Sequence, residues 1–180
     1  KGVLAVLKEI IENNRFSFQK GFSSWEDAIR TACQPLLDQN IITADYPGYI
    51  INNVHEFGPY IVIAPEICIP HAQEGKGVNE TAVAFMNVEE AVDFGPSSEY
   101  KPRLFFVLAS TDNEKHLGNL SELVTLVEDE NIITAVGSAF NEFAVHVARK
   151  LGYNCPDKIL SGYMDSDDVN DYIHHLQLLI

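Results

Sequence analysis

The chain has 180 residues, of which 46% are hydrophobic and 21% charged, and its formal net charge is −14. This length and composition are typical of one folded domain with a short appendage, and they exclude intrinsic disorder. The acidic charge repels nucleic-acid phosphates, three scattered cysteines give no disulfide framework, and no apolar run reaches the roughly 20 residues of a membrane span, so a cytoplasmic protein without direct nucleic-acid binding is expected.

The first two predicted helices flank a short strand. Apolar residues at helical spacing predict a helix over residues 3–11, and residues 15–18 follow as a strand. Ser23 and Glu26 have the spacing of a capping box, which predicts that the second helix begins near Trp25.

A third helix is predicted from a cap at Thr43 towards Glu56. Pro47 is tolerated there because it falls in or near the first turn. Gly58 and Pro59 then interrupt the chain, and the continuous apolar run at residues 60–64 predicts a buried strand.

The next segment alternates strands with helices. Residues 81–88 and 103–109 are predicted as strands, with a shorter edge piece at residues 90–95. Thr111 and Glu114 form a second predicted capping box, which opens a helix with apolar positions at helical spacing. Two further helices are expected at residues 131–136 and 141–151.

This alternation predicts an α/β domain with three layers, in which one mixed β-sheet carries helices on both faces. The domain is expected to span residues 1–151. The pattern changes after Gly152, because residues 153–171 are polar and acidic and residues 172–180 are apolar. We therefore expect residues 152–180 to form an appended tail, to which the sequence assigns no role.

The segment GPYIVIAPEICIPHA, residues 58–72, is the most informative stretch for function, and it carries His71. Pro65 and Pro70 restrict the backbone that leads to the histidine. A fixed imidazole can act as a nucleophile when a hydrogen bond holds its second ring nitrogen. From spacing alone, a structural histidine remains the commoner alternative. The sequence has no GxxxxGK[ST], GxGxxG or HExxH motif, so neither a cofactor nor a metal is expected.

Two other histidines lie near predicted helix ends. His116 falls in the first turn of the helix after Thr111, where free N–H groups and the helix dipole favour an anion, although from this feature alone a plain surface histidine is the commoner alternative. His55 lies near the end of the third helix, where a cation complements the dipole. The remaining histidines are interpreted as structural or incidental: His146, His174 and His175.

Three further side chains near His71 belong to residue types that can take part in chemistry. Cys68 could be a thiol nucleophile or a metal ligand, but between Ile67 and Ile69 a small buried hydrophobe is favoured. Glu66 and Glu74 would repel an incoming anion, so we expect them to face solvent or a protein partner.

The segment at residues 58–72, followed by Gly77 and Val78 and by DNEKHLGNLSEL at residues 112–123, resembles the enzyme IIA domains of the bacterial phosphoenolpyruvate-dependent sugar phosphotransferase system. The similarity is to the mannitol/fructose superfamily, and the GPY-x-V-x-AP lead-in is most similar to its ascorbate-type branch. It covers approximately residues 3–151.

This resemblance implies a phosphotransferase that carries phosphoryl groups. His71 would be the phosphorylated residue, and His116 would lie beside it and help to hold the phosphoryl group. The donor would be the histidine-phosphorylated carrier HPr, and the acceptor would be a cysteine of a IIB component. A homodimer is compatible with this interpretation.

Two positions depart from the family pattern. His55 stands where mannitol-type members have an arginine sixteen residues before the active histidine, and it is retained as a secondary site candidate; ascorbate-type members generally lack this arginine too. Glu66 stands where glycine is usual. A regulatory domain of a transcriptional regulator, controlled by phosphorylation of His71, is the main alternative, and a binding module that has lost phosphotransfer is a third.

Overall fold

The computed structural model describes residues 6, 9–10 and 12–128. Residues 6, 9, 10 and 12 are helical, in agreement with the first predicted helix, most of which lies outside the described residues. The predicted helices at 131–136 and 141–151 and the tail at 152–180 also lie outside them. In the described part of the chain, no helix is both long enough and apolar enough to span a bilayer.

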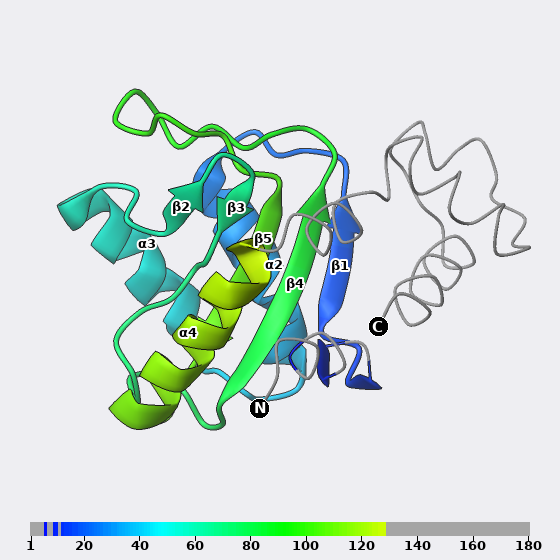
Figure 1. The fold of residues 1–180 in the computed structure, drawn as a ribbon, viewed down its shortest axis with the longest axis vertical. Helices are drawn as coiled ribbons and strands as arrows, with labels where there is room; N and C mark the ends of the chain where they lie inside the picture. The colour runs from blue at the N-terminus through cyan, green and yellow to red at the C-terminus, as the bar shows by residue number, and fades with distance from the viewer. Residues whose placement is uncertain (1–5, 7–8, 11, 129–180) are drawn as a thin grey trace, which may run out of the picture.

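A five-stranded mixed sheet forms the centre of the fold (Figure 1). It consists of β1 (Phe16–Gln19), β2 (Val62–Ala64), β3 (Ile67–Cys68), β4 (Ala82–Val88) and β5 (Leu104–Ala109), in the order β1-β4-β5-β3-β2. The pairs β1–β4 and β3–β5 are parallel, whereas β4–β5 and β2–β3 are antiparallel. The mixed sheet and the strands predicted near β1, β4 and β5 are therefore confirmed.

Helices cover both faces of this sheet. Helices α2 (Trp25–Asp38) and α3 (Tyr46–Phe57) share one hydrophobic core with alternate residues of β4 and β5, such as Met86 and Phe105. Helix α4 (Asn113–Glu128) packs on β5 and crosses in front of the sheet in Figure 1, with α2 behind it. Successive strand residues point to opposite faces, so β4 and β5, which are buried throughout, need both layers. The predicted three-layer architecture is confirmed.

The predicted cap of α2 is wrong by one residue. Ser24, not Ser23, is the N-cap, and its hydroxyl accepts a hydrogen bond of 3.2 Å from the backbone N–H of Asp27. An N-cap needs extended backbone geometry, which Ser24 has, with φ −147° and ψ 152°. Glu26 consequently makes no capping contact.

The predicted start of α3 is also displaced. Asp45 precedes the helix and makes no side-chain capping bond, while the carbonyl of Thr43 accepts the N–H of Tyr46 in a preceding turn. Pro47 lies within the first helical turn, as predicted. At the other end, Gly58 adopts φ +84° and donates its N–H to the carbonyl of Val54, which ends the helix.

The strand expected at residues 60–64 is confirmed in part, but the prediction that it is buried is wrong. Only the short strand β2 forms there, at the sheet edge, and Ile63 is 41% exposed. The buried strand of this region is β3, which follows β2 in a tight hairpin and pairs with β5. Apolar residues alone could not distinguish an edge strand from an interior one, because the sheet neighbours come from distant sequence.

The edge strand predicted at residues 90–95 is absent, since this segment is irregular. Val92 and Phe94 are nevertheless buried, and Phe94 stacks on Trp25 and Phe105 at ring-centroid distances of 5.5 and 6.3 Å. The apolar pattern there reflects packing against the core rather than strand pairing.

Candidate active site

Two parallel strands bring the predicted site residues together. The chain leaves β3 and continues beside β5, where Leu108 donates its N–H to the carbonyl of Pro70 at 2.9 Å and Gly75 donates to Ser110 at 2.7 Å. His71 therefore lies near the end of β5, from which the chain enters α4. The ring centroids of His71 and His116 lie 5.4 Å apart. The two imidazoles are therefore neighbours, as the family resemblance implied.

The His71 imidazole is held in one orientation by its own backbone. Its Nδ1 lies 2.7 Å from the carbonyl oxygen of Ile69. A carbonyl can only accept a hydrogen bond, so Nδ1 carries the proton and the neutral ring has its lone pair on Nε2. Burial lowers the pKa of His71 most strongly, and His116 lowers it further, while the bond to Ile69 opposes both. The result is an imidazole that favours the neutral, nucleophilic form.

Tyrosine hydroxyls hold the peptide group that follows His71. The hydroxyl of Tyr46 accepts the N–H of Ala72 at 3.1 Å and donates to the carbonyl of Leu108 at 2.6 Å. The hydroxyl of Tyr60 donates to the carbonyl of His71. Both polar ends of the His71–Ala72 peptide group are therefore bonded to a side chain.

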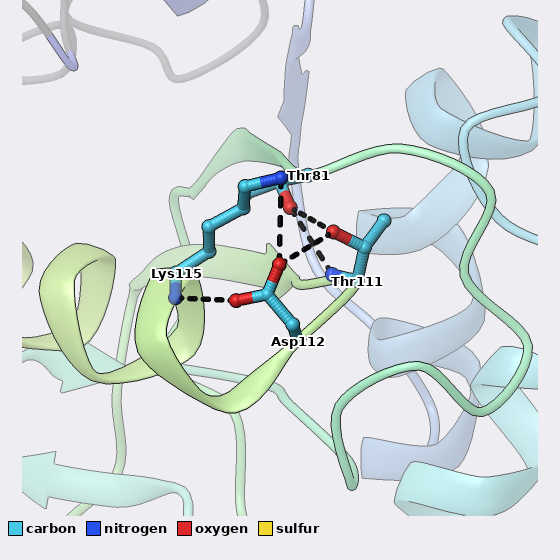
Figure 2. A network of polar contacts seen from close by, with 4 residues as sticks. All are labelled: Thr81, Thr111, Asp112 and Lys115. Atoms are coloured by element: carbon cyan, nitrogen blue, oxygen red, sulfur yellow. Dashed lines mark hydrogen bonds and ion pairs between the residues drawn. The ribbon is translucent and has the colours of Figure 1, made fainter.

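A polar network fixes the start of α4, which carries His116 (Figure 2). The hydroxyl of Thr81, next to β4, accepts the N–H of Thr111 and lies 3.1 Å from its hydroxyl. Asp112 accepts the N–H of Lys115 at 2.9 Å and forms an ion pair of 3.4 Å with its ammonium group. These contacts tie the first turn of α4 to the sheet.

The capping box predicted from Thr111 and Glu114 is thus replaced by Asp112. Its carboxylate directly precedes the helix and bonds to the third helical N–H, which is the N-cap arrangement. The hydrogen bond from the Lys115 N–H lowers the pKa of Asp112 more than any other contact. One of the N–H groups that the sequence offered to an anion is therefore already used.

The two histidines line a pocket of about 380 Å³. Helix α3, the loop after β3 and helix α4 all contribute to its wall. No lysine or arginine is present among the described residues that line it, so the histidines are its potential cations. The lining residues are Asn53, Phe57, Tyr60, His71, Ala72, Gln73, Glu74 and His116.

His55 is not brought to this pocket. Its Nε2 lies 3.4 Å from a carboxylate oxygen of Glu26, and its ring packs against Trp25 at 5.0 Å between centroids. Asn53 and Phe57, one turn apart on α3, line the pocket instead. His55, at the position expected to hold an arginine in mannitol-type members, therefore lies on a different face of α3 from the residues that line the pocket.

The side chains of Glu66 and Cys68 also lie outside the pocket lining. Glu66 lies in the β2–β3 hairpin, where its carboxylate is 3.7 Å from a guanidinium nitrogen of Arg103. Cys68 is fully buried, and burial raises the pKa of its thiol well above the usual value, which agrees with the predicted small hydrophobe. The predicted exposed position of Glu74 is partly met, because it is half-buried at the pocket wall. His146, His174 and His175 lie outside the described residues.

Sequence reasoning did not assign Tyr60, Asn53 or Phe57 to the site. Tyr60 belongs to the same motif as His71, eleven residues before it, so the motif itself contained the signal.

The apolar stripe predicted on α4 is only partly buried, since Leu123 is buried whereas Leu117, beside His116, is 57% exposed.

Comparison with known proteins places these features in one class, the sugar phosphotransferase systems. Residues 9–147 match the family described as "Phosphoenolpyruvate-dependent sugar phosphotransferase system, EIIA 2", and the chain belongs to this family. The ascorbate-specific PTS system EIIA component of Salmonella choleraesuis (strain SC-B67) is 26% identical over 122 residues, which cover 67% of this chain and 79% of that protein.

Solved structures of enzyme IIA proteins share the fold. The mannitol-specific cryptic phosphotransferase enzyme IIA CmtB from Escherichia coli is 26% identical with a TM-score of 0.65, over 74% of this chain and 90% of that chain. The complex of enzyme IIAMtl and phosphorylated enzyme IIBMtl from Escherichia coli matches with a TM-score of 0.59 and 18% identity, over 89% of this chain and 94% of that chain. The predicted family and fold are confirmed.

Proposed function

We propose that this protein is a cytoplasmic phosphoryl carrier in which His71 accepts a phosphoryl group from phospho-HPr and passes it to a cysteine of a IIB component. The observation that carries the proposal is the hydrogen bond from Nδ1 of His71 to the carbonyl of Ile69, because it leaves Nε2 as the nucleophile. Membership of the EIIA family supports a role in phosphoryl transfer.

The first transfer exchanges one N–P bond for another. The Nε2 lone pair of His71 attacks phosphorus, the N–P bond of the donor histidine breaks, and its electron pair stays on the donor nitrogen. In the second transfer a thiolate of the IIB component attacks phosphorus, and the electron pair returns to Nε2. Positioning and donors to the phosphoryl oxygens are the main requirements of such steps. His116, whose ring centroid is 5.4 Å from that of His71, would supply one donor.

The ascorbate-type branch is the proposed sugar class. The ascorbate-specific relative at 26% identity supports it. The pocket wall agrees with it as well, since no arginine occurs among the described lining residues and His55 pairs with Glu26 instead.

Phosphorylation in a purified system tests the first half of the proposal. The protein is incubated with phosphoenolpyruvate, enzyme I and HPr, and acid-labile phosphate is measured. We expect one phosphoryl group on the wild type and none on His71→Gln. His116→Gln should slow the reaction by at least about tenfold, because it removes the imidazole donor to the phosphoryl oxygens. His55→Gln is the matched control and should react at the wild-type rate. Phosphate on His71→Gln would refute the assignment of the acceptor.

The fate of the phosphoryl group tests the second half. Purified phosphoprotein is mixed with candidate IIB proteins, including ascorbate-type ones, and the phosphate on each partner is followed. Transfer to a IIB cysteine supports a transport carrier. The IIB partner of the solved mannitol-type complex provides a comparison from another branch. Phosphate that stays on His71 with every IIB protein would favour the regulatory alternative.

A further inference from the structure

We propose that Tyr60 is a positioning residue for His71, which holds the backbone carbonyl of the histidine with its hydroxyl and limits rotation of the imidazole with its ring. This inference rests on the proposed function, because it concerns how fast the same histidine accepts a phosphoryl group.

The backbone at His71 is held by hydrogen bonds with two tyrosine hydroxyls. The carbonyl of the His71–Ala72 peptide group accepts the Tyr60 hydroxyl, and the N–H of the same group donates to the Tyr46 hydroxyl. The preceding carbonyl, that of Pro70, is bonded to the N–H of Leu108. With both polar ends of one peptide group fixed, the group cannot turn about the chain without breaking a bond.

The imidazole of His71 has two aromatic neighbours. The ring of Tyr60 meets the ring of His71 edge to face, at 86° between planes and 5.2 Å between centroids. His116 is a second ring neighbour at 5.4 Å. These neighbours, with the bond from Nδ1 to Ile69, restrict the imidazole before the donor arrives. Ordering a nucleophile in advance lowers the entropy lost on reaching the transition state.

The hydroxyl of Tyr60 has to remain protonated in order to donate its hydrogen bond to the carbonyl of His71. Burial is the largest influence on the Tyr60 hydroxyl and raises its pKa, while a hydrogen bond from Asn53 opposes this. The phenol therefore stays protonated at neutral pH. Helix α3 also reaches this site, because Asn53 lies on that helix and lines the same pocket as Tyr60 and His71.

Tyr46 and Tyr60 differ in solvent exposure, and this difference predicts that Tyr46 matters more for the stability of the fold. Tyr46 is buried, with 1% of its surface exposed, whereas 36% of Tyr60 is exposed. Loss of a hydroxyl costs most stability where its partners are cut off from water. Tyr60 lies at the pocket wall, so its removal should change the reaction of His71 more than the stability of the fold.

The test compares Tyr60→Phe, which keeps the ring, with Tyr60→Leu, which removes both hydroxyl and ring. Tyr49→Phe is the matched control, since Tyr49 lies on α3 but does not line the pocket. With phospho-HPr as the donor, we expect kcat to fall about 3- to 10-fold in Tyr60→Phe, as for the loss of one hydrogen bond, and further in Tyr60→Leu. KM should change by less than about twofold, since substrate binding is not the step affected. Tyr49→Phe should match the wild type.

The nitrogen-15 NMR spectrum of the His71 ring gives a readout that a purely structural role would not move. The wild type should show protonated Nδ1, and Tyr60→Phe should show a larger share of the other tautomer or broadened signals, with its melting temperature unchanged. If Tyr60→Phe unfolds, Asn53→Ala replaces it and should shift kcat and spectrum in the same direction by less.

Wild-type kcat and an unchanged ring spectrum in Tyr60→Phe would overturn the inference. Failure of the proposed function appears differently, as a wild-type protein that phospho-HPr does not phosphorylate. In that case the ring spectrum decides alone, and a spectrum identical in wild type and Tyr60→Phe rejects the positioning role.

Discussion

His71 experiences opposing influences on its proton. Burial and the neighbouring His116 disfavour the charged ring, whereas the hydrogen bond to Ile69 favours it, and burial prevails, so the pKa is lowered from 6.5. A phosphoryl acceptor benefits from this balance, because protonation of Nε2 would remove the attacking lone pair. The bond that fixes the tautomer also favours the unreactive cation, but burial outweighs it.

The lowered pKa predicts the pH dependence of phosphoryl acceptance. The decline of the rate on acidification should have its midpoint below pH 6.5, where a free imidazole is half protonated, and should approach about tenfold per pH unit below the lowered pKa. Single-turnover reactions with purified phospho-HPr and NMR titration of the His71 ring carbons measure the two quantities independently. His71→Gln identifies the signal.

The shift has a matching consequence for stability. Below about pH 6.5 the unfolded chain binds a proton at His71 more readily than the native one, so this group's favourable contribution is present above that pH and is lost as pH falls through the folded pKa. A rate that declined with a midpoint above pH 6.5 would contradict the assignment.

Helix α4 positions His116 through its first turn. The carboxylate of Asp112 caps the helix, and the threonine pair Thr81 and Thr111 joins this turn to β4 and β5. A terminal helical turn without such contacts frays, because its N–H groups lack partners within the helix. The geometry of the second histidine is therefore a property of the cap as well as of the helix.

Removal of this cap should weaken both the fold and the reaction. Asp112→Ala is expected to lower the melting temperature by a few degrees and to slow phosphorylation of His71, because the turn that carries His116 loses its partner for the Lys115 N–H. Asp45→Ala is the matched control, since Asp45 precedes α3 without a side-chain capping bond and should change both quantities less.

The lowered pKa of Asp112 predicts how the stabilising effect of this cap depends on pH. Its stabilising contribution should be present above the ordinary value of 3.8 and disappear as pH falls through the lower folded pKa, so wild type and Asp112→Ala should converge in stability at strongly acid pH. A difference that grew on acidification would argue against the cap.

The molecule as a whole is held around Tyr46. This buried side chain starts α3, donates to the end of β5 and accepts the N–H of Ala72, so one hydroxyl joins a helix, the sheet and the active-site loop. Burial raises the pKa of this hydroxyl, which keeps it a donor to Leu108. The site therefore depends on the same contact as the packing of α3.

Tyr46→Phe should lower the free energy of unfolding by about 1–3 kcal/mol, because buried hydrogen-bonding groups lose their partner. Urea denaturation measures this, with Tyr49→Phe as the control of the same type on the same helix. Equal stability of Tyr46→Phe and wild type would show that water replaces the hydroxyl without cost.

The sequence alone determined the features that are written locally. Mostly apolar runs identified β4 and β5, because a strand buried on both faces is made mainly of apolar residues. The motif around His71 identified the family, because several specific residues occur together in one short segment. The meeting of His71 with His116 also followed from this resemblance.

Tertiary structure decided the features that depend on distant partners. The choice of Ser24 over Ser23 as a cap depends on backbone geometry that one residue of sequence does not distinguish. The position of β3 depends on pairing with β5, and the role of Tyr46 depends on a carbonyl 62 residues away. Periodicity reports which face of an element is apolar, but it carries no information about which hydroxyl will meet which peptide group once the chain has closed on itself.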